Sequence, residues 1–229
     1  MIMTGALACR RCPPDFVPVG MEQVRSARAA SGKTWREMLA SPIFYPMIVL
    51  LLCGALSGMM IISQAASIAK TSIGMGPAAA AAAVSVIALF NMAGRMAAGM
   101  LSDRLGRLAV LMGALVLSAC GLGVLMTAGT GDDASFYLGC VLVGLSFGAF
   151  MAIYPGFTAD RFGTAHASVN YGIMFCGFAA AGFGGPTLMR EMQAAGMDFE
   201  ACCMMALGFC AAGLMTALVC RIMMKTSEG

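Results

Sequence analysis

The sequence predicts an all-α membrane protein, a bundle of six transmembrane helices. Hydrophobic residues make up 60% of the 229 residues and charged residues only 11%, whereas about a quarter of residues are charged in soluble domains. Six runs without Asp, Glu, Lys or Arg follow one another, each near the roughly 20 residues that a helix needs to cross the hydrocarbon core. The runs are continuously apolar, which excludes the alternating strands of a membrane β-barrel. We expect spans near residues 44–68, 77–100, 108–128, 135–157, 167–189 and 201–223.

Residues 1–40 differ from the rest, and we expect them to form a cytoplasmic tail ahead of a transmembrane domain at 41–229. The tail holds six of the fourteen basic residues. Thr34 and Glu37 have the spacing of a capping box, which predicts a short helix along the membrane surface. Cys9 and Cys12 have CxxC spacing, but a zinc site needs further ligands. We therefore expect no metal and no cofactor.

The placement of Lys and Arg predicts the orientation. One set of connectors and both termini carry most of them: the six of the tail, then Arg104, Arg107, Arg161, Arg221 and Lys225. The opposite connectors hold only Lys70 and Arg190, beside five acidic residues. By the positive-inside rule, both termini are cytoplasmic in a multi-pass protein of the inner or plasma membrane.

A polar stretch at residues 94–107 separates the second span from the third. Its segment Ser102-Asp-Arg-Leu-Gly-Arg107 is echoed by Ala159-Asp-Arg-Phe-Gly-Thr164 between the fourth and fifth spans. The echo predicts an inverted pair of three-helix repeats, as in many secondary transporters. The alternative is that D-R-x-G is simply a common turn. We expect Asp103 to begin the third helix, where its carboxylate can cap free N–H groups.

The polar stretch resembles the signature cytoplasmic loop of the major facilitator superfamily, in the copy between the eighth and ninth helices. The resemblance implies a gate whose ion pairs hold in one state and release in another. A turn that merely anchors the protein by its positive charge is the alternative. The gating residues would be Gly99, Asp103, Arg104, Gly106, Arg107, Asp160 and Arg161.

A second set of motifs is similar to the oxalate/formate antiporter family. It includes Phe90-Asn-Met-Ala-Gly-Arg95, Asn170-Tyr-Gly-Ile173 and Gly184-Gly-Pro186. The likeness runs along the chain but covers only the second half of a twelve-helix carrier, so it implies the C-terminal half of a major-facilitator fold. Its partner would be the N-terminal six-helix half or a second copy of the chain.

The resemblance also implies a function, secondary transport of a small organic anion by antiport or proton coupling. Oxalate-exchanging members carry a lysine in the helix that corresponds to 167–189, and residues 162–189 contain no basic residue. That departure favours a monocarboxylate such as formate, lactate or pyruvate. The alternative is a truncated membrane protein or half-carrier that only pairs with a partner.

Arg95 is the leading candidate for contact with the substrate. It lies eight residues before Asp103, about 12 Å deeper along a helix, where a charge marks a pathway by default. Asn91 shares its face, and an arginine can hold a carboxylate by two hydrogen bonds. The alternative is that Arg95 extends to the surface. Further candidates, which could bind substrate or only tie helices together, are Gln64, Tyr154 and Tyr171.

Other functional classes find little support in the sequence. Hydrolase, zinc-protease and nucleotide-binding motifs are lacking, and a single histidine, His166, leaves few acid–base options. No basic cluster is interleaved with aromatic residues, as nucleic-acid binding would require. We therefore expect no enzyme and no nucleic-acid partner; the predicted partners are the lipid bilayer and the anion.

Overall fold

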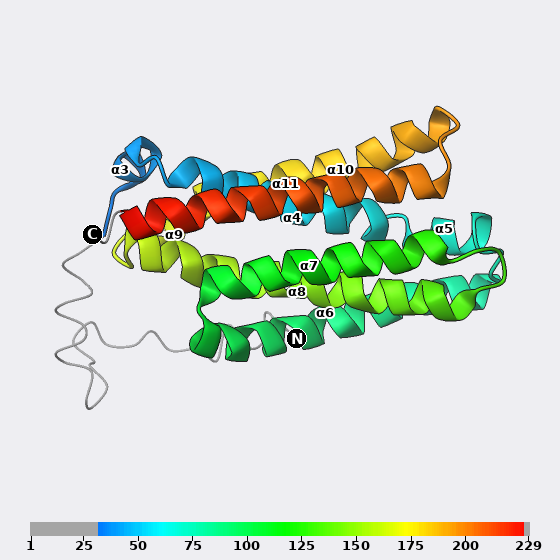
Figure 1. Ribbon diagram of the computed structural model, residues 1–229. Helices are drawn as coiled ribbons and strands as arrows, with labels where there is room; N and C mark the ends of the chain where they lie inside the picture. The colour runs from blue at the N-terminus through cyan, green and yellow to red at the C-terminus, as the bar shows by residue number, and fades with distance from the viewer. Residues whose placement is uncertain (1–31, 227–229) are drawn as a thin grey trace, which may run out of the picture.

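The computed structural model describes residues 32–226, which form an elongated bundle of roughly aligned helices (Figure 1). Three helices in this range are short: α3 Trp35–Ala40, α5 Ala65–Thr71 and α9 Ala167–Met174. The long helices are α4 Phe44–Ile62, α6 Pro77–Leu105, α7 Arg107–Thr127, α8 Asp133–Phe162, α10 Cys176–Ala194 and α11 Phe199–Thr226.

Six helices in the described range are long and apolar enough to cross a membrane, with α9 and α10 together forming one of them. This confirms the predicted all-α bundle of six spans and identifies a multi-pass membrane protein. The predicted spans lie on these helices, and two of them contain breaks. The first span breaks at Ser63 and Gln64, between α4 and α5, and the fifth breaks at Phe175, between α9 and α10.

The predicted capping box starts α3. The Thr34 N–H donates to Glu37 Oε2 at 2.7 Å, and the Glu37 N–H donates to Thr34 Oγ1 at 3.5 Å. A hydrogen bond that favours the ionised carboxylate lowers its pKa, and the Thr34 N–H holds the pKa of Glu37 below its ordinary value. Asp132 caps α8 through Ser135, which likewise lowers the pKa of Asp132. The short predicted helix is confirmed.

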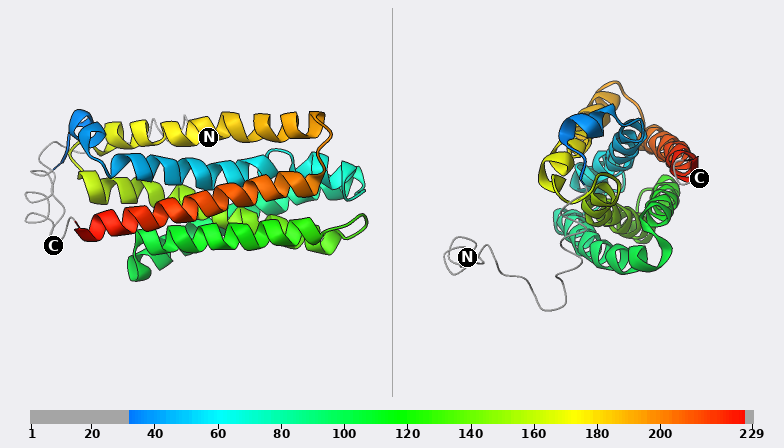
Figure 2. Two further views of the ribbon diagram at one scale, coloured as in Figure 1. Left: turned by 45° about the horizontal axis from the view of Figure 1, so that its top comes forward. Right: turned by 90° about the vertical axis from the view of Figure 1, so that its left-hand side faces the viewer.

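The long helices pack as two groups of three. α4 packs against α10 and α11, and α8 packs against α6 and α7. The groups meet where α4 contacts α8 and α7 contacts α11, and the end-on view in Figure 2 shows the resulting ring. Exchanging the first span with the fourth, the second with the fifth and the third with the sixth leaves these pairings unchanged. The packing therefore has the pattern of an inverted pair of three-helix repeats.

The two D-R-x-G turns are not equivalent under that exchange. They join the second span to the third and the fourth to the fifth, and both lie at one end of the bundle (Figure 1). An inverted repeat would match the first of these connectors with the one between the fifth and sixth spans, at the opposite end. The prediction that the echo marks the repeat is therefore wrong. We call the end that carries both turns the basic end.

What the two turns share is local backbone geometry. Gly106 and Gly163 have φ angles of 85° and 83°, a region that glycine enters without steric cost. Each glycine ends its helix, with its N–H bonded to the carbonyl of Ser102 or Ala159 four residues earlier. The common-turn alternative accounts for the echo.

Helices α6 and α8 approach to backbone contact. A Cβ on Gly94 would meet the Leu145 carbonyl, and a Cβ on Gly148 would meet the Asn91 carbonyl. Small residues at such crossings let membrane helices pack closely. The crossing fixes the segment of α6 that carries Asn91 and Arg95.

Candidate functional site

Arg95 and Asn91 form a polar pair on the exposed side of α6. The Arg95 Nε donates to Asn91 Oδ1 at 3.0 Å, so the prediction that the two share a helix face is confirmed. Arg95 lies ten residues before Leu105, the last residue of α6, or about 15 Å from that end. Its bond to residue i−4 directs the side chain toward the start of α6, away from the basic end. This geometry disfavours extension of Arg95 to the surface at that end.

Tyr171 joins Arg95 from another helix. It lies in α9, and the Arg95 guanidinium is close enough to act on its phenol electrostatically. The Tyr171 ring packs on Phe175, with ring centroids 5.5 Å apart, at the break between α9 and α10. Of the five predicted substrate-binding residues, Asn91 thus contacts the Arg95 guanidinium directly, and Tyr171 lies within its electrostatic range.

The other two predicted substrate-binding residues lie apart from this group. Gln64 is at the break between α4 and α5. It lies about 30 Å along the helix axis from Phe44, where α4 begins at the basic end. Tyr154 is fully buried, and its hydroxyl donates to the Met47 carbonyl at 2.9 Å, which joins α8 to α4. The position of Tyr154 fits the helix-tying alternative, since contact with a substrate would have to break this bond.

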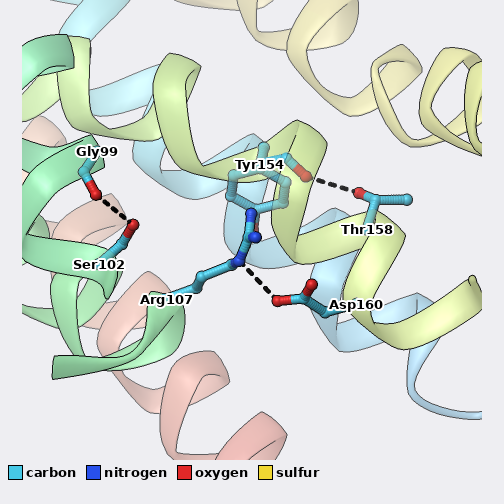
Figure 3. Close-up of polar contacts among 6 residues, drawn as sticks. All are labelled: Gly99, Ser102, Arg107, Tyr154, Thr158 and Asp160. Atoms are coloured by element: carbon cyan, nitrogen blue, oxygen red, sulfur yellow. Dashed lines mark hydrogen bonds and ion pairs between the residues drawn. The ribbon is translucent and has the colours of Figure 1, made fainter. Parts of the chain in front are cut away.

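An ion pair connects the two D-R-x-G turns. Arg107, the first residue of α7, places its Nε 2.6 Å from Asp160 Oδ2 in the last turn of α8 (Figure 3). Both partners of this ion pair belong to the same six-helix bundle. Within residues 32–226, neither Asp103 nor Arg104 makes an ion pair, and both are exposed.

The predicted capping role of Asp103 is wrong. α6 continues to Leu105, so Asp103 lies in its last turn, and α7 begins only at Arg107 without a side-chain cap. The positive φ of Gly106 decides where the helix ends. A carboxylate near a helix C-terminus meets the negative end of the dipole, which is unfavourable. Asp160 occupies the same position in α8, where Arg107 compensates its charge.

Gly156 is a site residue that the sequence analysis missed. The Arg107 guanidinium lies against it, and a Cβ at this position would overlap the guanidinium atoms. Gly156 precedes Asp160 by four residues and so shares its face of α8. Its position one turn before the second D-R-x-G motif is the only sequence signal that could have identified it.

The segment before α3 is also part of the basic end. The Lys33 N–H donates to the Phe162 carbonyl at 2.7 Å, and the Asn170 Nδ2 donates to the Lys33 carbonyl at 2.8 Å. Gly32 forms an antiparallel bridge with Gly163. Three interactions therefore tie this segment to the turn between α8 and α9. The division into a tail at 1–40 and a domain at 41–229 stays a prediction, and Cys9 and Cys12 lie outside the described residues.

Among residues 32–226, no group of three or more His, Cys, Asp or Glu side chains is placed to hold a metal ion. The site consists of an exposed arginine with its amide and phenol neighbours on α6 and α9, and a separate ion pair at the basic end. Such a site can bind an anion and can link two turns. It offers no nucleophile paired with a base.

Comparison with known proteins places the chain in a family. The sequence model of the Major Facilitator Superfamily matches residues 10–186. The chain is 28% identical over 180 residues to the uncharacterized MFS-type transporter YhjX of Escherichia coli (strain K12), a match that covers 78% of this chain and 43% of that protein. It is 27% identical over 150 residues to the oxalate:formate antiporter of Oxalobacter formigenes, covering 65% of this chain and 36% of the antiporter. The chain thus spans less than half the length of these relatives. Since the family model matches most of its residues, the chain belongs to the major facilitator superfamily.

Proposed function

We propose that the chain is one six-helix half of a secondary transporter that carries a small organic anion by alternating access. The observation that carries the proposal is the exposed pair of Arg95 and Asn91 within a membrane-spanning helix. Membership of a transporter superfamily and two transporter relatives support it.

Arg95 carries a full positive charge within a membrane-spanning helix. A guanidinium that faced the hydrocarbon would be costly, and charges within spans line pathways or face other helices. The Nε of Arg95 is engaged by Asn91, which leaves the two Nη groups as donors. A carboxylate accepts such donors through both of its oxygens. Tyr171 adds a phenol within electrostatic range of the same guanidinium.

The proposed substrate is a monocarboxylate such as formate, lactate or pyruvate. An oxalate:formate antiporter is among the relatives, which supports carboxylate transport by exchange; proton coupling is the other mode. A dianion would favour a second cation near Arg95, and residues 162–189, which include α9 and most of α10, contain none.

The proposed orientation places the basic end in the cytoplasm of a cell, with both termini on that side. Seven of the ten Lys and Arg residues in the described range lie at this end: Lys33, Arg36, Arg104, Arg107, Arg161, Arg221 and Lys225. Short cytoplasmic segments of membrane proteins carry such an excess. The ion pair of Arg107 and Asp160 would then latch the cytoplasmic gate in one state.

The proposed partner is an N-terminal six-helix half or a second copy of the chain. Met92, Met96 and Met100 follow one another at four-residue spacing on α6 and are 58%, 64% and 74% exposed. They form an apolar stripe beside Arg95, and methionine adapts well to a partner's surface. A partner seated there would cover Arg95 and enclose the pathway.

A non-transporting half-carrier is the second candidate function. The exposed stripe of Met92, Met96 and Met100 would serve pairing with another helical half whether or not Arg95 binds an anion. In that case the chain would bind its partner, and transport would require both.

The experiment compares the full chain with Arg95→Gln in proteoliposomes, using radiolabelled formate, lactate and pyruvate. Uptake should be abolished in the variant, and calorimetry should show loss of anion binding. The matched control is Arg190→Gln, which removes an exposed arginine from α10 and should leave uptake unchanged. Uptake and affinity equal to the parent in Arg95→Gln would contradict the substrate role. Binding without uptake by the parent chain would favour the half-carrier.

A further inference from the structure

A pocket of about 590 Å³ opens at the basic end, between the α6–α7 turn, α8 and α11. Three arginines line it, Arg107 and Arg161 beside the turns and Arg221 near the end of α11, with one acid, Asp160. Arg107 and Asp160 compensate each other's charge, and Arg221 adds a further positive charge to the lining. Arg221 is exposed and makes no ion pair within the described part of the chain.

A second hollow begins where this pocket ends. It measures about 400 Å³ and follows α6 and α7 over the surface of α8. Alanine, leucine and glycine line it almost throughout, including Ala97, Leu101 and Gly113. Leu105 and Ala109 line both hollows. A basic pocket thus runs directly into an apolar groove along membrane-spanning helices.

We infer that this composite site binds one anionic phospholipid, with its phosphate among the arginines and an acyl chain in the groove. Basic pockets at the cytoplasmic ends of transmembrane helices attract anionic headgroups, and an apolar groove at membrane depth suits a hydrocarbon chain. A soluble phosphate would use the pocket alone. The joined groove distinguishes the lipid from the free anion.

Occupancy would act on the gate. The lipid phosphate and Asp160 would both bind Arg107, whose Nε already contacts the carboxylate. A phosphate that draws the guanidinium away weakens the link between the two turns. The lipid would thereby favour release of the latch. Neither Arg95 nor Asn91 lines the site, so lipid binding is independent of the substrate proposal.

The test is native mass spectrometry of the full chain in detergent, titrated separately with phosphatidylglycerol, phosphatidylcholine and glycerol phosphate. One phosphatidylglycerol should bind in preference to phosphatidylcholine. Arg221→Gln should weaken that binding about tenfold, the effect of one lost charge-assisted hydrogen bond. Lys225→Gln is the matched control, because it removes an exposed charge one turn later on α11 that does not line the pocket.

A second variant tests the groove. A Cβ on Gly113 meets no atom within 4 Å, so Gly113→Leu fits without disturbing the backbone and fills the groove. It should weaken phosphatidylglycerol binding, whereas Gly123→Leu, at an equally open position of α7 outside the groove, should not. Equal binding of both lipids, or unchanged affinity in Arg221→Gln, would overturn the inference. The inference would also be overturned if glycerol phosphate bound tightly and Gly113→Leu left the affinity for phosphatidylglycerol unchanged.

Discussion

Arg107 and Asp160 join two turns of the same sequence pattern, with 2.6 Å between Nε and Oδ2. The side chains are 33% and 54% exposed, and ion pairs exposed to this degree contribute at most about 1 kcal/mol. The pair therefore adds little to the stability of the bundle. A link of that strength breaks readily, which suits a latch.

Asp160→Asn should loosen the basic end while leaving the rest of the bundle intact. The amides of Val110 and Gly163, which donate to the Gly106 and Ala159 carbonyls, should exchange hydrogen up to about fivefold faster, because at most about 1 kcal/mol is lost. Hydrogen exchange followed by mass spectrometry provides the measurement. Asp103→Asn, at the matching position of the other turn, is the control, since Asp103 makes no ion pair in the described residues.

The charge-reversed double variant Arg107→Asp with Asp160→Arg should restore slow exchange, provided that the two side chains interact directly. If hydrogen exchange were accelerated equally in Asp160→Asn and Asp103→Asn, the carboxylates would act through their negative charge alone and not through the ion pair with Arg107.

Gly148→Ala should destabilise the crossing of α6 and α8. The new Cβ would collide with the Asn91 carbonyl and lie 3.0 Å from the Arg95 nitrogen. Overpacking of this kind costs about 1–3 kcal/mol, so circular dichroism should show a lower Tm. At Gly99 a Cβ meets no neighbouring atom, and Gly99→Ala should raise the Tm through better helix propensity. Equal Tm values for the two variants would be inconsistent with a backbone contact at Gly148.

Tyr154→Phe and Tyr171→Phe should separate stability from binding. Tyr154→Phe loses the hydrogen bond to the Met47 carbonyl, at a cost of about 1 kcal/mol, and anion affinity should stay unchanged. Tyr171→Phe should keep the Tm and weaken anion binding, because its phenol is within electrostatic range of Arg95. Thermal unfolding and calorimetry on both variants provide the readouts. The reverse pattern would assign Tyr154 to the substrate and Tyr171 to packing.

Hydropathy and spacing were sufficient for the bundle and for part of the site. The spans follow from the length of apolar runs, and the capping box at Thr34 and Glu37 depends on residues three apart. The pairing of Arg95 with Asn91 follows from helical periodicity. All three are local properties, so the sequence expresses them directly.

The missed features depend on single glycines or on distant segments. Asp103 was assigned to the wrong helix because Gly106, three residues later, decides where α6 ends. The hydrogen bond of Tyr154 to Met47 spans 107 residues, and that of Asn170 to Lys33 spans 137. No local pattern specifies such partners. The role of Gly156 depends on a tertiary contact, because the guanidinium of Arg107, from another helix, lies against it.

The division of the bundle into two groups of three has a consequence for biogenesis. α4 finds its main partners in α10 and α11, and α6 and α7 find theirs in α8. When the ribosome has delivered only the first three spans to the membrane, each of them still lacks its main neighbour. The second and third spans, α6 and α7, gain their main packing partner when the fourth span, α8, enters the membrane. The first span gains its main partners only when the last two, α10 and α11, have been inserted. Assembly of this domain therefore finishes late in translation, and the spans inserted early stay without their main neighbours until then.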